Sequence, residues 1–142
     1  MTFTPEELAY LASQRLGRLA TMAPGGDLQN NPVSFHVNAD GTVDIPGRRM
    51  GASRKFRNVQ THPQVAFVVD DIASVTPWVV RCLEIRGEAE ALTDVDPPAP
   101  YFSREVIRIR PRRVISFGIG EGAAPAARDA GRQAPSGMPG AG

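Results

Sequence analysis

A run of cations between Arg48 and Arg57 contains the residues of this sequence best suited to bind a ligand. Five cations lie within ten residues: Arg48, Arg49, Arg54, Lys55 and Arg57. They surround the expected start of a short helix, for which Ser53 is a suitable N-cap. A helix N-terminus offers unpaired backbone N–H groups and the positive end of the helix dipole, while arginine adds bidentate donors and lysine a mobile charge. The segment therefore predicts a phosphate site, with an exposed basic helix as the alternative.

A second cluster combines an aromatic side chain with an arginine. Trp78, the only tryptophan, precedes a predicted strand, and Arg81 follows three residues later. A loop tryptophan with a nearby arginine can form the wall of a site for a planar ligand or anchor a subunit contact. The alternative is a tryptophan that caps the hydrophobic core.

The sequence shows no arrangement for nucleophilic or metal catalysis. His36 and His62 lie near no Gly-x-Ser-x-Gly elbow, and the chain has neither a P-loop nor a Gly-x-Gly-x-x-Gly motif. A single cysteine and two histidines argue against a disulfide or a structural zinc site. The pair Asp70-Asp71 is expected in a solvated loop or as a helix cap. We therefore predict no metal and assign no catalytic residue.

Short segments separated by turn residues predict a mainly β domain. Thr4-Pro5-Glu6-Glu7 is a capping box, which predicts a first helix over 5–15. Apolar runs predict six strands, over 18–22, 28–37, 42–45, 65–69, 79–92 and 104–117, with a short helix over 54–60 and a bulge at Gly87. Antiparallel strands joined by tight turns predict a small barrel, because closure removes exposed sheet edges.

Length and composition place these elements in one domain over 1–119, followed by a disordered tail over 120–142. The last 23 residues include six Gly, seven Ala and three Pro, which cannot build a core. The chain has 16 cations and 15 anions, and this balance argues against a nucleic-acid partner. Neither a membrane-spanning apolar run nor a secretory signal is present, so we expect a cytoplasmic protein without a membrane partner.

Six segments, two of which overlap the clusters described above, carry a family resemblance: 10–21, 53–59, 63–71, 77–78, 84–91 and 109–118. In this order they resemble the split-barrel flavin-binding family typified by pyridoxamine 5′-phosphate oxidase, over roughly residues 3 to 119. The chain is most similar to the actinobacterial branch of that family that uses the deazaflavin coenzyme F420. Within the branch it resembles the subgroup of reductases that finish tetracycline-type antibiotics.

The resemblance implies a six-stranded antiparallel split β-barrel that forms a homodimer with two cofactor sites at the subunit interface. It implies that Lys55, with Arg54 and Arg57 near it, faces the cofactor phosphate. Charge and helix polarity point independently to the same residues.

The resemblance also implies contacts for the rest of the cofactor. The backbone of the strand that contains Asn31, Pro32, Val33 and Ser34 is expected to lie along the flavin-like ring. Trp78 and Arg81 match the region that reaches over from the partner subunit. Three features depart from the family pattern, namely the polar stretch 28–31, the adjacent pair Arg48-Arg49 and the long Gly/Ala/Pro-rich tail.

These observations predict an oxidoreductase that uses reduced F420 to transfer a hydride to an unsaturated small-molecule acceptor. FMN is the alternative cofactor, because both molecules carry a phosphate; Arg48 and Arg49 could meet the anionic tail that only F420 has. A non-catalytic protein that binds a flavin or F420 is the other alternative. Since the cofactor supplies the reactive centre, no nucleophile is required, and a proton could come from solvent, Ser34 or Tyr101.

Overall fold

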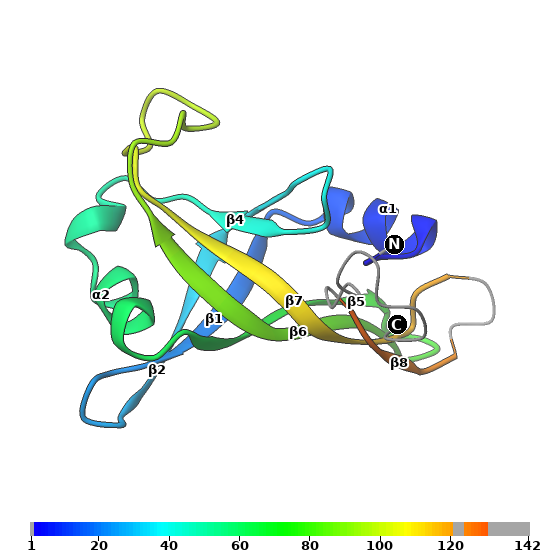
Figure 1. Cartoon of the computed structure of the whole chain (residues 1–142). Helices are drawn as coiled ribbons and strands as arrows, with labels where there is room; N and C mark the ends of the chain where they lie inside the picture. The colour runs from blue at the N-terminus through cyan, green and yellow to red at the C-terminus, as the bar shows by residue number, and fades with distance from the viewer. Residues whose placement is uncertain (1, 121–123, 131–142) are drawn as a thin grey trace, which may run out of the picture.

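The computed structural model describes residues 2–120 and 124–130. Its elements are α1 (Pro5–Ser13), β1 (Leu16–Met22), β2 (Leu28–Ser34), β3 (His36–Val37), β4 (Val43–Ile45), the 3-10 helix η1 (Met50–Ala52), α2 (Arg54–Thr61), β5 (Gln64–Ser74), β6 (Val79–Leu92), β7 (Val106–Phe117) and β8 (Ala126–Asp129). The strands pair antiparallel in the order β2-β1-β5-β6-β7-β4-β3, and β8 pairs with β7. The protein is therefore mainly β with few short helices (Figure 1).

The sheet curls into a half-barrel because its two end strands belong to one stretch of chain. β2 ends at Ser34 and β3 begins at His36, yet β2 pairs with β1 and β3 pairs with β4. Phe35 alone separates them, so the chain passes from one end of the sheet path to the other within a single residue. α1 and α2 lie at opposite ends of the curled sheet (Figure 1).

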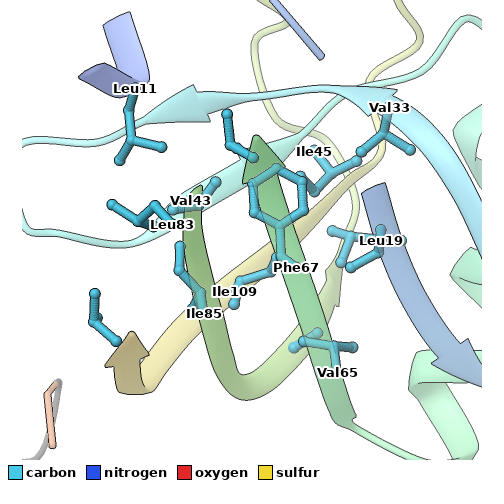
Figure 2. Close-up of a cluster of buried hydrophobic side chains, with 14 of the residues drawn as sticks. Leu11, Leu19, Val33, Val43, Ile45, Val65, Phe67, Leu83, Ile85 and Ile109 are labelled. Carbon is cyan, nitrogen blue, oxygen red and sulfur yellow. The ribbon is translucent and has the colours of Figure 1, made fainter. Parts of the chain in front are cut away.

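Inward-facing side chains of the strands fill the half-barrel. Val65, Phe67 and Val69 alternate with less buried residues along β5, as expected for a strand with one face on the core. Figure 2 shows Phe67 among Leu19, Val33, Ile85 and other aliphatic side chains from neighbouring strands. Burying each side chain of this size stabilises the fold by about 1.5–3 kcal/mol.

Gly17 and Gly87 allow close approaches inside the sheet. A Cβ atom at Gly17 would lie 2.2 Å from Cζ of Phe67, so the large ring depends on the missing side chain. Gly87 sits at a register shift between β6 and β7, where a Cβ would lie 2.3 Å from the carbonyl oxygen of Arg110. The bulge expected at Gly87 is thus confirmed.

The expected count of six strands is wrong, since the described residues form eight. All six expected strands are present, but the one predicted over 28–37 is interrupted at Phe35 and becomes β2 and β3. Hydrophobic patterning does not detect such a break, because Phe35 packs against the core as Val33 and Val37 do. The eighth strand, β8, lies in the segment expected to be a tail.

The expectation of disorder over 120–142 fails for Ala126–Asp129, which form β8 along the second half of β7. Strand pairing uses backbone groups, so a stretch with small side chains can still cover a free sheet edge. Arg128 then pairs with Glu7 of α1. Residues 121–123 and 131–142 of that predicted tail lie outside the described residues.

The solvated loop or helix cap expected for Asp70-Asp71 is also wrong, because both residues lie in β5, which continues to Ser74. Asp70 pairs with Arg18 of β1, and Asp71 pairs with Arg81 across the β5–β6 hairpin. These partners lie on neighbouring strands, so their carboxylates are neutralised within the sheet. Among the described helices, none is long and apolar enough to cross a membrane.

Candidate cofactor site

The N-terminus of α2 is built as the sequence predicts. Ser53 is the N-cap, and its Oγ accepts a hydrogen bond of 3.3 Å from the backbone N–H of Phe56. Phe56, Asn58 and Val59 are buried against the sheet, while Arg54 and Arg57 are exposed and Lys55 is half-buried. The helix thus turns an apolar face to the core and its cations outward.

A polar network fixes how α2 lies against the β1–β2 hairpin. Asn58 is almost fully buried, and its Nδ2 donates to Oγ1 of Thr21 at 3.0 Å and to Oε1 of Gln29 at 3.2 Å. Gln29 in turn donates to Oδ1 of Asn31. Gln29, in the polar stretch 28–31, therefore links α2 to β2.

The direction of α2 follows from its contacts. Nε2 of His62, at the C-cap, lies 3.4 Å from the carbonyl oxygen of Pro24 in the β1–β2 turn, whereas Asn58 reaches Gln29 further along β2. One helical turn toward the N-terminus therefore moves away from the hairpin turn and along β2. Lys55, three residues before Asn58, therefore lies further from the hairpin turn than Asn58 does.

Arg48 and Arg49 precede η1 and are held by the segment before β7. The backbone N–H of Met50 donates to Oγ of Ser103 at 3.0 Å, and that hydroxyl donates to the carbonyl oxygen of Gly47. Oε1 of Glu105 accepts from the N–H of Gly51 at 3.1 Å. Cζ of Arg48 lies 5.1 Å from the ring centroid of Tyr101, a cation–π contact.

Ion pairing separates these five cations from the other arginines. Nine arginines pair with carboxylates, namely Arg18, Arg81, Arg86, Arg104, Arg108, Arg110, Arg112, Arg113 and Arg128. We call Arg48, Arg49, Arg54, Lys55 and Arg57 the cation cluster; within the described chain none of its members has a carboxylate partner, and Arg15 is the one other cation like them. Intramolecular acids thus neutralise the positive charge elsewhere but not here.

The strand expected to face the ring alternates in burial along β2. Val33 is buried, Asn31 and Ser34 are half-buried and Pro32 is exposed. Pro32 has no backbone N–H, so the chain cannot donate a hydrogen bond at that point. The hydrogen bond from Asn58 joins α2 to β2 at Gln29, two residues before this segment. That residues 31–34 and the cation cluster flank one cofactor stays a prediction.

Trp78 and Arg81 lie away from this group within one chain. β5 starts just after α2 and runs eleven residues before the hairpin that carries Trp78, a contour length of about 35 Å. The hairpin end lies toward α1 and not toward α2 (Figure 1). Trp78 is 64% exposed, so the alternative of a core-capping tryptophan is wrong.

Arg81 is engaged in a local polar cluster. Its guanidinium makes two hydrogen bonds to Asp71 and lies 5.0 Å from the ring centroid of Tyr10. The hydrogen bond from Arg81 holds the pKa of Asp71 below its ordinary value, although burial opposes this, and the Tyr10 hydroxyl also donates to that carboxylate. Burial and Asp71 raise the pKa of Tyr10 far above its usual range. Arg81 therefore has less free hydrogen-bonding capacity than the cation cluster.

Sequence reasoning missed the residues that support the cluster. The Asn58–Gln29–Asn31 network and the Arg48–Tyr101 contact depend on side chains that are distant in sequence. The sole signal for the first was the polar composition of 28–31 where an apolar strand was expected. Tyr101 was considered as a proton donor but not as a partner of Arg48.

The cluster suits a phosphate-bearing cofactor. The first turn of α2 carries cations and no acid, which opposes the helix dipole and concentrates positive charge at one exposed point. An anion there would gain charge-assisted hydrogen bonds from side chains that lack internal partners. The described residues contain no group of three or more His, Cys, Asp or Glu side chains able to hold a metal ion.

Comparison with known proteins places this arrangement in a family. Residues 3–124 match the family described as pyridoxamine 5′-phosphate oxidase. The chain is 49% identical over 121 residues to a 5a,11a-dehydrotetracycline/5a,11a-dehydrooxytetracycline reductase of Streptomyces rimosus, covering 84% of this chain and 85% of the reductase.

Solved structures share the fold. A structure described as an F420 reductase is 27% identical, with a TM-score of 0.53, and the match covers 68% of this chain and 86% of that one. A FAD-binding protein from Mesorhizobium loti is 19% identical, with a TM-score of 0.59 and coverage of 82% and 94%. The second likeness concerns the fold alone.

Proposed function

This chain belongs to the pyridoxamine 5′-phosphate oxidase family, and on that premise we propose that it is an oxidoreductase that uses reduced F420 to reduce an unsaturated small molecule. The reductase from Streptomyces rimosus supports the reaction class, and the likeness to an F420 reductase supports the cofactor. When bound, reduced F420 supplies the hydride.

The observation that carries the proposal is the unpaired cation cluster at the start of α2. Lys55, Arg54 and Arg57 would hold the cofactor phosphate, with Ser53 maintaining the exposed first turn through its cap. Arg48 and Arg49 extend the positive charge beyond the helix and would hold the anionic tail that distinguishes F420 from FMN. Arg48 is positioned for this by Tyr101.

The remaining predicted contacts complete the site in a homodimer. Residues 31–34 of β2 would lie along the ring, with Asn31 oriented by Gln29. Trp78 and Arg81 are distant from the cluster in one chain, so they would contribute from the partner subunit. The exposure of Trp78 supports this role, because a large apolar side chain on a hairpin tip is suited to a subunit contact.

The acceptor we propose is a tetracycline-type polyketide with a carbon–carbon double bond conjugated to a carbonyl group. This follows the name of the Streptomyces rimosus reductase, which is 49% identical. The residues of this chain would orient the acceptor, and a proton would reach it from solvent or from Ser34 on β2.

Titration of the purified chain with F420 and with FMN, followed by anaerobic single-turnover assays, tests the proposal. We expect saturable F420 binding, weaker FMN binding, and loss of reduced F420 absorbance on adding a dehydrotetracycline. Tight FMN binding with no response to F420 would favour the flavin enzyme, because the same cluster could hold the FMN phosphate. Cofactor binding without reduction of any acceptor would favour the non-catalytic binding protein.

A further inference from the structure

A cavity of about 630 Å³ lies between α1 and the segment that runs through β3 to its turn with β4. It is separate from the cation cluster and shares no residue with it. A volume of this size suits a drug-sized molecule. The cavity therefore has room for a polycyclic ligand rather than a single ion or water.

The inner wall of the cavity is apolar and firmly packed. Phe3 and Leu11 are each 2% exposed, so they belong to the core as well as to the cavity wall. Phe35 packs edge-on against Phe67, with ring centroids 5.3 Å apart. A wall anchored in the core in this way presents a fixed apolar surface.

The outer rim adds an exposed aliphatic side chain and polar groups. Leu8 is 40% exposed although its helix has a buried face, and it lines the cavity. Asn38 and Asp40 are held in the β3–β4 turn by hydrogen bonds with Thr42. His36 alternates along the strand with the core-facing Phe35 and Val37, and it also lines a smaller cavity with Asp44 and Arg108.

The cavity begins where β2 ends. Phe35 and His36, which line it, directly follow Ser34, the last of the four residues expected beside the cofactor ring. If the cofactor ring lies along β2, a molecule in the cavity would therefore meet that ring at the Ser34 end of the strand. The contact between acceptor and cofactor ring rests on the proposed function, whereas the cavity and its lining residues are observed independently of it.

We propose that this cavity binds the acceptor, a polycyclic molecule with an apolar body and a polar edge. The apolar body lies against Leu11 and Phe35. The polar edge faces the rim, to which Gln14 and Asp40 contribute. Cofactor and acceptor are then held by different elements of the chain, α2 for the first and α1 with β3 for the second.

Two alanines of α1 give a matched test. Ala12 lines the cavity, Ala9 does not, and both are exposed. We would titrate the full chain without cofactor against tetracycline, a saturated relative of the proposed acceptor, and follow tetracycline fluorescence. We expect Ala12→Phe to weaken tetracycline binding about tenfold or more by filling the cavity, and Ala9→Phe to leave it unchanged.

F420 binding by the two α1 variants is the control. Both α1 variants should bind F420 like the parent chain. Since tetracycline binding is measured without cofactor, failure of F420 to bind would contradict the proposed function and leave this inference standing.

Three results would overturn the inference. The parent chain could show no saturable binding of tetracycline. Ala12→Phe and Ala9→Phe could bind it equally. Ala12→Phe could instead weaken F420 binding or change the subunit stoichiometry, and the cavity would then be part of the cofactor site or a subunit contact.

Discussion

The two α-helices begin with the same kind of cap but with opposite charges. Thr4 caps α1 and Ser53 caps α2, each accepting a hydrogen bond from the third residue of its helix. The first turn of α1 carries Glu6 and Glu7, whereas that of α2 carries cations and no acid. Because a helix N-terminus is positive, α1 follows the rule for a stable helix and α2 violates it.

The buried carboxylate at the start of α1 has partners inside the chain, whereas the cations at the start of α2 have no carboxylate partner among the described residues. Glu7 is 3% exposed and completes the α1 capping box, and it also accepts hydrogen bonds from Ser116 and Arg128. No described carboxylate does the same for Arg54 or Lys55. A local departure from helix-stabilising charge, in a chain that otherwise pairs its arginines, is the expected mark of a binding site. The following predictions test this difference between the two ends.

The largest effect is expected from Glu7→Ala, which removes the internal neutralisation of α1. Ser116 and Arg128 would lose their buried acceptor, and the capping box would be lost as well. We expect the free energy of unfolding to fall by about 3 kcal/mol, measured by urea denaturation. Glu6→Ala, in the same turn but exposed, is the control and should change it by about 0.5 kcal/mol or less. Equal losses from both variants would show that the buried contacts of Glu7 do not stabilise α1.

The next effect concerns α2, where we expect a loss of binding rather than stability. Lys55→Gln keeps the approximate length of the side chain but removes the charge-assisted contact that we propose Lys55 makes to the cofactor phosphate. Such a contact contributes about 2 kcal/mol, so F420 affinity should fall about 30-fold in a fluorescence titration. Arg112→Gln is the control, because Arg112 is an exposed arginine already paired with Glu88. If both variants weaken F420 binding equally, net charge rather than the cation cluster determines affinity.

The same two helix ends show what sequence reasoning can and cannot predict. The Thr4 capping box, the Ser53 cap and the cation run are local patterns, and the structure has both helices where they were expected. Arg128 as the partner of Glu7 could not be predicted, because the pair joins residues 121 positions apart through a strand with almost no side-chain signal. Likewise, the network of Asn58 with Gln29 exists only after α2 has packed on the hairpin.

The cavity beside α1 shows the same limit for the fold as a whole. Patterns of period two predicted the strands, but not the break at Phe35 that ends β2 and opens the cavity wall. A break between two strands on opposite ends of a sheet follows from closure of the half-barrel, which is a long-range property.

A smaller effect is expected in the pH dependence of stability. Burial alone would raise the pKa of Glu7, but hydrogen bonds from Arg128, Thr4 and Ser116 outweigh it and hold this pKa below the ordinary value of 4.5. The carboxylate therefore stabilises the fold above about pH 4.5, and this contribution is lost as the pH falls through the folded-state pKa. Below pH 4.5, urea denaturation should show a shallower loss of stability for Glu7→Gln than for the parent chain. Parallel curves for the two proteins would contradict the assignment.

The smallest effect on the free energy of unfolding is a gain rather than a loss, and the variant that produces it tests whether binding and stability can be separated. Arg54→Glu places an acid in the first turn of α2, as in α1, so the helix dipole is complemented rather than opposed. Because Arg54 is exposed and has no described ion pair, nothing internal is lost, and we expect the cofactor-free chain to gain about 0.5 kcal/mol in free energy of unfolding.

The same variant should bind F420 more weakly than Lys55→Gln, since it reverses a charge beside the proposed phosphate site. Arg86→Glu in β6 is the control, because Arg86 is exposed but paired with Glu84, and there the reversal should destabilise the chain slightly and leave F420 binding unchanged. A loss of stability in Arg54→Glu would mean that the cation at this position serves the fold, and the distinction between the two helix ends would then fail.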